Sequence, residues 1–127
     1  MKVEIYERLV QEVIDDLPEE LRSKIQNVQI VVEDRPTREQ LRAAGVRPPA
    51  TLFGLYQGIP LKARGAWYGN VLPDKITLFR KPIEAHSATS EALARTVRHT
   101  VLHEIGHYFG LTEEQLRAIE QKWQTNS

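Results

Sequence analysis

The chain has no cysteine, a single methionine and no excess of charge of either sign. Without cysteine it has no disulfide, no thiolate metal ligand and no cysteine nucleophile. Its 17 basic and 17 acidic side chains cancel, so the composition gives no global field that would attract nucleic acid or an anionic membrane. Any metal site must therefore use imidazole and carboxylate ligands.

Long hydrophobic runs are also missing. No segment approaches about 18 consecutive apolar residues, the length that spans a membrane. Acidic residues interrupt the N-terminal segment where a signal peptide needs an apolar run. We therefore predict a cytoplasmic protein without a membrane partner. Its 127 residues predict a single domain over 1–127 with one core.

Helical and extended patterns are mixed along the chain. The periodicity predicts helices over 3–17, 18–25, 37–45, 87–110 and 112–123 and strands over 27–34, 51–58 and 74–83. In the last strand Ile76 and Leu78 alternate with Thr77 and Phe79, which predicts one solvent-facing side. Long crossover helices do not regularly separate the strands, so an α+β fold is expected rather than a doubly wound sheet.

The stretch VLHEIGHYFGLTEEQL, residues 101–116, contains the motif H-E-x-x-H. On a helix His99, His103 and His107 fall within about 80° of one another and form one stripe, while apolar residues occupy other sides. This pattern predicts a buried central helix that lines a cleft. Small residues that border the stripe are expected to leave room for a metal and a substrate: Thr96, Thr100, Gly106 and Gly110.

Two imidazoles one helical turn apart can hold a zinc ion. Glu104 lies about 100° round the helix from His103, which is near enough to take a proton from a water molecule at the metal. Zinc lowers the pKa of such a water molecule. The hypothesis is therefore a Zn²⁺ cofactor with His103 and His107 as ligands and Glu104 as the general base. The competing interpretation is that these histidines are ordinary polar residues of a helix surface.

A catalytic zinc ion needs a third protein ligand. Glu113 lies ten residues after His103, and Gly110 between them can adopt the left-handed conformation that ends a helix and reverses the chain. Glu113 is therefore the first choice for this ligand, followed by Glu114 and Glu120. The alternative is that Glu113 and Glu114 only complement the dipole of a helix that Thr112 caps.

His99 is expected to support the ligands or to be merely buried. Three imidazoles at four-residue spacing lie in a row along the helix axis, so they cannot all surround one ion.

The motif resembles that of the zincins, metallopeptidases with H-E-x-x-H on the active-site helix. The stretches PTREQL, TLFGLYQGIPL, VLPDKITLFRKPI and VLHEIGHYFGL occur in this order and are similar to those of very small bacterial zincin-like proteins, described as minimal metalloproteases. The resemblance implies a compact α+β zincin-like fold, with a small mixed sheet packed on the H-E-x-x-H helix, and a zinc-dependent peptidase. By motif position it makes His103 and His107 ligands and Glu104 the base.

Two departures separate the chain from the metzincins. Their extended motif ends in His or Asp, where this chain has Glu113, and their methionine turn is absent because the one methionine is Met1. A second resemblance is to a metalloendoribonuclease family of ribosomal RNA maturation. That family has a third histidine at the spacing where this chain has Glu113.

The expected substrate is a peptide or protein, bound along the strand 51–58, where Gly58 permits close backbone approach. One alternative is a metal-binding regulatory or interaction domain without efficient catalysis. A less favoured one is a metal-dependent endoribonuclease, since no nucleic-acid partner is expected. Tyr56, Tyr68 and Arg80 could donate hydrogen bonds to an oxyanion, but we expect them to be structural.

Overall fold

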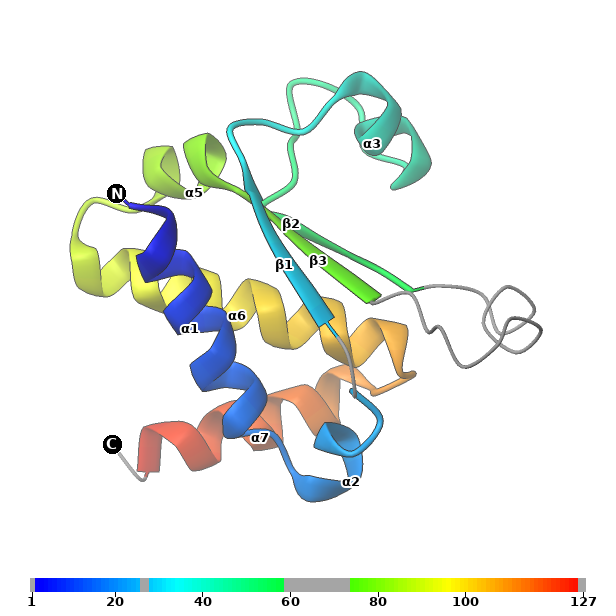
Figure 1. Cartoon of the computed structure of the whole chain (residues 1–127), viewed down its shortest axis with the longest axis vertical. Helices are drawn as coiled ribbons and strands as arrows, with labels where there is room; N and C mark the ends of the chain where they lie inside the picture. The colour runs from blue at the N-terminus through cyan, green and yellow to red at the C-terminus, as the bar shows by residue number, and fades with distance from the viewer. Residues whose placement is uncertain (1, 26–27, 59–73, 126–127) are drawn as a thin grey trace.

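We describe a computed structural model of the chain over residues 2–25, 28–58 and 74–125 (Figure 1). Its elements in chain order are α1 (Val3–Asp15), α2 (Glu19–Arg22), β1 (Val28–Glu33), α3 (Arg38–Ala43), β2 (Gly54–Gln57), β3 (Asp74–Phe79), α5 (Arg80–His86), α6 (Ser90–Tyr108) and α7 (Glu113–Thr125). These elements confirm the predicted α+β class. No helix among the described residues is long and apolar enough to cross a membrane.

The sheet has three strands in the order β1-β3-β2. Strand β1 pairs with β3 in parallel, and β2 pairs with β3 antiparallel, with Gly54 opposite Leu78 and Gln57 opposite Lys75. The sheet is therefore small and mixed, as the resemblance implied. Strand β2 lies at its edge, beside the helix that carries the histidines.

Helices α1 and α6 pack together over the sheet, α1 against β1 and α6 against β2, and α7 packs against α6 (Figure 1). The core between these elements contains fully buried side chains from α1, β3 and α6, among them Tyr6, Val10, Ile76, Leu78, Val97 and Val101. Each such aliphatic side chain stabilises the fold by roughly 1.5–3 kcal/mol. Helix α6 is thus a central helix, as its sequence pattern predicted.

The prediction of a solvent-facing side on β3 was wrong. Thr77 and Phe79 are 0% exposed, so the strand is buried on both faces. β3 is the central strand of the sheet, and alternating polarity in its sequence does not show that its second face is covered as well. The strand also ends earlier than expected, because α5 already begins at Arg80. Pro82 fits the first turn of this helix, where its missing N–H costs no intrahelical hydrogen bond.

Candidate metal centre

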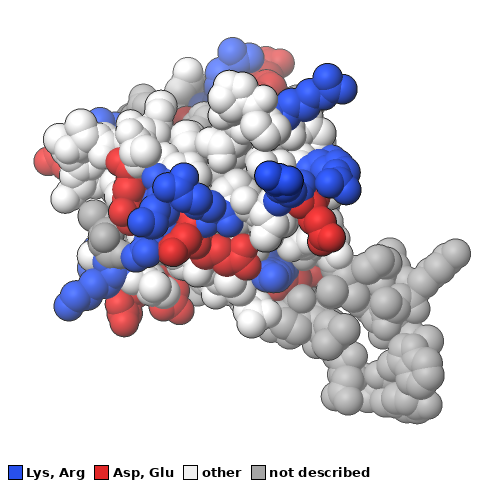
Figure 2. Space-filling view, turned by 90° about the horizontal axis from the view of Figure 1, so that it is seen from above, with Lys and Arg blue, Asp and Glu red and all other residues white. Residues whose placement is uncertain are grey.

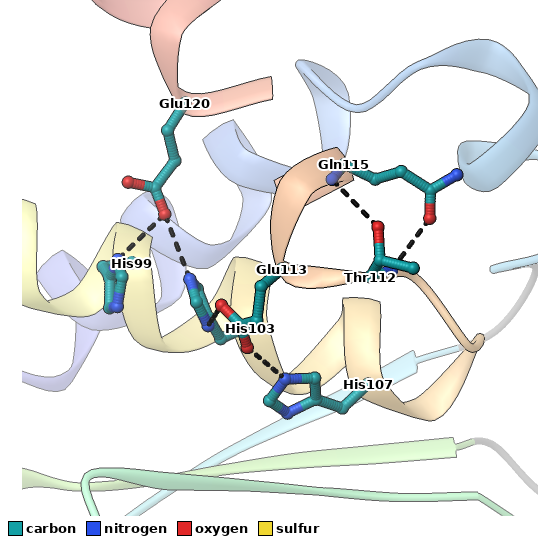
Figure 3. Close-up of polar contacts among 7 residues, drawn as sticks. All are labelled: His99, His103, His107, Thr112, Glu113, Gln115 and Glu120. Atoms are coloured by element: carbon teal, nitrogen blue, oxygen red, sulfur yellow. Dashed lines mark hydrogen bonds and ion pairs between the residues drawn. The ribbon is translucent and has the colours of Figure 1, made fainter. Parts of the chain in front are cut away.

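Helix α6 holds the histidines in place through its other faces. The helix begins after Thr89, whose hydroxyl accepts a hydrogen bond of 3.0 Å from the Ala92 amide. Leu93, Val97, Val101 and Ile105 are buried in the core. Packing of these side chains fixes the rotation of α6, so that His99, His103 and His107 lie in a row on the side that faces α7 (Figure 3).

Gly110 ends this helix and reverses the chain. Its φ of 78° is in the left-handed region that favours glycine. The Leu111 amide donates to the Gly106 carbonyl at 2.8 Å, and the Gly110 amide donates to the His107 carbonyl at 3.2 Å. These two bonds are the pattern of a Schellman motif, in which a right-handed α-helix ends at a residue in the left-handed conformation. The predicted role of Gly110 is confirmed.

A capping box then starts α7 close to the histidines. The Thr112 amide donates to Gln115 Oε1 at 2.8 Å, and the Gln115 amide donates to Thr112 Oγ1 at 3.1 Å (Figure 3). Glu113 is the first residue of this helix and points back toward α6 (Figure 3). The two interpretations of Glu113 are therefore compatible, because it begins a helix and also reaches the histidine stripe.

His103, His107 and Glu113 come together as the sequence predicted. Their ligand atoms all lie within 4.8 Å of one another. Glu113 Oε1 is 3.0 Å from His107 Nε2, and Glu113 Oε2 is 3.8 Å from His103 Nδ1. Ligand atoms round a tetrahedral zinc ion with bonds of about 2.0–2.1 Å are roughly 3.3 Å apart. The donor set and its spacing therefore fit a zinc ion.

The protonation states in this cluster also suit a metal. Burial lowers the pKa of His103, and the neighbouring His99 adds to the effect, while Glu113 and Glu120 oppose it. The hydrogen bond with His107 lowers the pKa of Glu113. Neutral imidazole and ionised carboxylate are the forms that a metal ion requires.

Glu104 points to another side of α6, toward the sheet edge. Its Oε1 accepts a hydrogen bond of 3.1 Å from the backbone amide of Tyr56 in β2. Burial raises the pKa of Glu104, and the bond from Tyr56 opposes that rise. The carboxyl group is therefore fixed in orientation, and its affinity for a proton is increased.

A sequence profile of zincin-like metallopeptidases matches residues 25–123. The chain belongs to this family. Membership suggests a metal-dependent, peptidase-like function and implies a divalent metal, typically zinc. No curated protein matches the chain.

Among solved structures, a conserved hypothetical protein of T. thermophilus is similar to this zincin-like chain. The TM-score is 0.55 at 20% sequence identity, and the match covers 85% of this chain and 94% of the other. At this identity the likeness shows that the two proteins share a fold.

This zincin-like chain carries a second cluster of possible metal ligands, formed by His99, His103 and Glu120. Glu120 Oε1 is 2.8 Å from His99 Nδ1 and 3.3 Å from His103 Nε2 (Figure 3). The His99 side chain is 57% exposed, so the alternative that it is merely buried was wrong. Glu114, the other alternative ligand, is in neither cluster of the described residues.

Two of the small residues beside the stripe, Gly106 and Thr100, do not leave the predicted room for substrate, whereas the space beside Gly110 is open. A Cβ on Gly106 would overlap the side chain of Leu116, so this glycine allows α7 to pack closely on α6. The Thr100 Cγ2 atom lies 2.9 Å from where a Cβ on Gly54 would stand, so Thr100 packs against β2. Gly106 and Thr100 are small because α7 and β2 pack very close to α6 at these two positions.

The other predicted residues have structural contacts. The Tyr56 hydroxyl donates to the buried Asp74 at 2.6 Å, and Arg80 forms a 2.7 Å ion pair with Asp34. The close approach expected at Gly58 is made by the ring of Tyr108 from α6. Tyr68 lies outside the described residues.

Proposed function

We propose that the chain is a zinc-dependent, peptidase-like hydrolase in which His103, His107 and Glu113 hold the metal and Glu104 is the general base. The observation that supports this most directly is the convergence of two α6 histidines with a carboxylate from α7. Glu104 on the adjacent side of the same helix completes the arrangement. Membership of the zincin-like family supports the same reaction class.

Each residue has a distinct part in the reaction. A divalent metal, when bound, supplies the Lewis acidity that lowers the pKa of water to near neutrality. Glu104 accepts the proton from the attacking water and then donates it to the leaving amine. The Tyr56 amide keeps the Glu104 carboxylate turned toward the sheet edge, which reduces the reorganisation needed when the proton moves.

The substrate is an extended peptide that pairs with β2. In the described part of the sheet, β2 has β3 on one side and no strand on the other. The Tyr56 amide points to this outer side, because it donates to Glu104. A peptide that adds to the edge through main-chain hydrogen bonds therefore has its backbone beside the general base.

The alternative is a metal-binding regulatory or interaction domain without efficient catalysis. The bond from Tyr56 to Glu104 favours it, because it occupies one carboxylate oxygen of the base. An endoribonuclease would need a basic surface, whereas acidic and basic side chains are interspersed on the face of the molecule in Figure 2. The mixed surface charge thus argues against the endoribonuclease, and the peptidase remains the first proposal.

The test of the reaction is Glu104→Gln, which keeps the shape of the side chain and removes the base. We expect zinc content to be unchanged and peptide cleavage to fall by about 10²- to 10⁴-fold. Cleavage would be measured on a broad peptide library with protein purified without chelating resin. If wild-type protein binds zinc and cleaves no peptide, the non-catalytic alternative replaces the proposal.

The test of the third ligand is Glu113→Ala against the matched control Glu114→Ala. Both variants remove one acid from the first turn of α7, so both lose the same favourable contact with the helix dipole. We expect only Glu113→Ala to weaken zinc binding, by at least about 10- to 100-fold. Equal zinc affinity together with equal peptide cleavage in the two variants would show that Glu113 is not a ligand.

A further inference from the structure

The ligand cluster at the H-E-x-x-H motif is repeated one helical turn away along the same two helices. His99 and His103 have the same four-residue spacing on α6 as His103 and His107. Glu113 and Glu120 are seven residues apart on α7, which is two turns, so they share a face of that helix. Each adjacent histidine pair therefore faces a carboxylate of its own (Figure 3).

The contacts in the second cluster are as short as those in the first. Glu120 Oε1 lies 2.8 Å from His99 Nδ1 and 3.3 Å from His103 Nε2. The imidazole rings of His99 and His103 have centroids 3.9 Å apart and an angle of 34° between their planes, so their ring nitrogens lie near one another. Two imidazoles and one carboxylate are a ligand set that zinc accepts in proteins.

His103 belongs to both clusters through different ring atoms. Its Nδ1 faces Glu113 at 3.8 Å, and its Nε2 faces Glu120 at 3.3 Å. A neutral imidazole carries a proton on one nitrogen and can bind a metal ion only through the other. The two clusters therefore cannot both use His103 at the same time.

We propose that His99, His103 and Glu120 form a second zinc position that competes with the first for His103. This position goes beyond the proposed hydrolase activity and has contacts of its own, although the two positions share one ligand. An ion held there lies about one helical turn farther from the middle of the motif, and so farther from Glu104. The second position therefore holds zinc in a state that the base does not use.

Solvent reaches both ends of the histidine stripe. The side chains of His99 and His107 are 57% and 55% exposed, whereas His103 between them is only 20% exposed. An ion can therefore arrive at either cluster from solvent and exchange between them through the half-buried His103.

The experiment breaks each cluster separately and measures Zn²⁺ binding by calorimetry and chelator competition. His107→Ala/Glu113→Ala removes the first cluster and His99→Ala/Glu120→Ala removes the second. We expect one equivalent of Zn²⁺ in wild type and in each double variant, because either cluster suffices. Adding Glu120→Ala to His107→Ala/Glu113→Ala should weaken the remaining binding by at least about 10- to 100-fold.

Nuclear magnetic resonance of the ring nitrogens identifies the histidines in use. In His107→Ala/Glu113→Ala, addition of Zn²⁺ should shift the nitrogens of His99 and His103. His86→Ala is the control, because His86 is an exposed histidine that belongs to neither cluster. All four substituted side chains of the double variants are at the surface or half-buried. If one variant unfolds, His107→Gln/Glu113→Gln or His99→Gln/Glu120→Gln replaces it.

The outcomes separate this proposal from the proposed function. If His107→Ala/Glu113→Ala binds no Zn²⁺, or binds it without moving the His99 resonances, the second position is disproved. Two equivalents in wild type would disprove the competition for His103. If only His99→Ala/Glu120→Ala loses Zn²⁺, the second position stands and the first ligand set fails.

Discussion

Two faces of α6 differ in what they contribute. On one face Leu93, Val97, Val101 and Ile105 are 0–4% exposed and pack into the core. On the other, His99 and His107 are more than half exposed and lie against carboxylates of α7. Apolar burial therefore keeps the helix in place, while the polar face adds little to stability and provides the donor atoms. Substitutions in this helix are therefore expected to alter metal binding and folding stability separately, according to the face on which they lie.

Helix α7 differs from α6 because it combines both roles on one face. Leu116 is 0% exposed and packs against Gly106, and it lies between Glu113 and Glu120 in the sequence. These three residues are spaced by three and four positions, so they point in the same direction. The packing of Leu116 against Gly106 therefore sets the positions of both carboxylates relative to the histidines.

The largest effect that separates the two faces of α6 is expected from Leu93→Ala. Loss of this buried side chain should lower the free energy of unfolding by about 2–5 kcal/mol. Zinc affinity of the folded protein should stay unchanged, since Leu93 is ten residues from His103. The matched variant His107→Ala should do the reverse, with unfolding changed by no more than about 0.5 kcal/mol and zinc affinity lowered, because the first cluster is broken and only the second position remains. Urea denaturation without metal, combined with zinc titration, gives both quantities. A loss of zinc binding in Leu93→Ala would show that the faces are coupled.

A smaller effect that tests the role of α7 is expected from Gly106→Ala. The new methyl group meets Leu116, so we expect a cost of about 1–3 kcal/mol in unfolding free energy from overpacking. Because α7 must move, zinc affinity should fall as well. A double-mutant cycle with Leu116→Ala checks the cause, since the methyl group has space once Leu116 is shortened. Additive effects in that cycle would place the strain elsewhere.

The smallest effect is expected from Tyr6→Phe, which removes a hydrogen bond between α1 and α5 and changes none of the histidines or carboxylates of the two clusters. The Tyr6 hydroxyl donates a 2.6 Å hydrogen bond to Glu84, and this bond lowers the pKa of Glu84. We expect a loss of about 1 kcal/mol near neutral pH and no change in zinc affinity. Because the pKa is lowered in the folded state, the stabilisation is complete above the unfolded pKa and is lost as pH falls through the folded pKa. Denaturation curves of both proteins between neutral and acidic pH should therefore converge toward the acidic end. A constant difference across this range would show that Glu84 is not the partner that matters.

Local patterns in the sequence predicted most of what positions the site. The apolar spacing predicted α6 as a central helix, Gly110 predicted its end, and Thr112 with Gln115 predicted the start of α7. These features depend on residues within a few positions of one another, so the sequence is enough to specify them. The grouping of His103, His107 and Glu113 followed from the same local geometry.

Contacts between distant segments were decided only by the tertiary structure. Nothing near Gly106 in the sequence shows that Leu116 fills the space beside it, and nothing near Thr77 shows that the second face of β3 is buried. The pairing of Glu120 with His99 likewise depends on how α7 lies across α6. The sequence by itself thus determined the kinds of donor atom and their order along two helices. Packing between those helices decided which donors meet, because it sets distances that local periodicity does not contain.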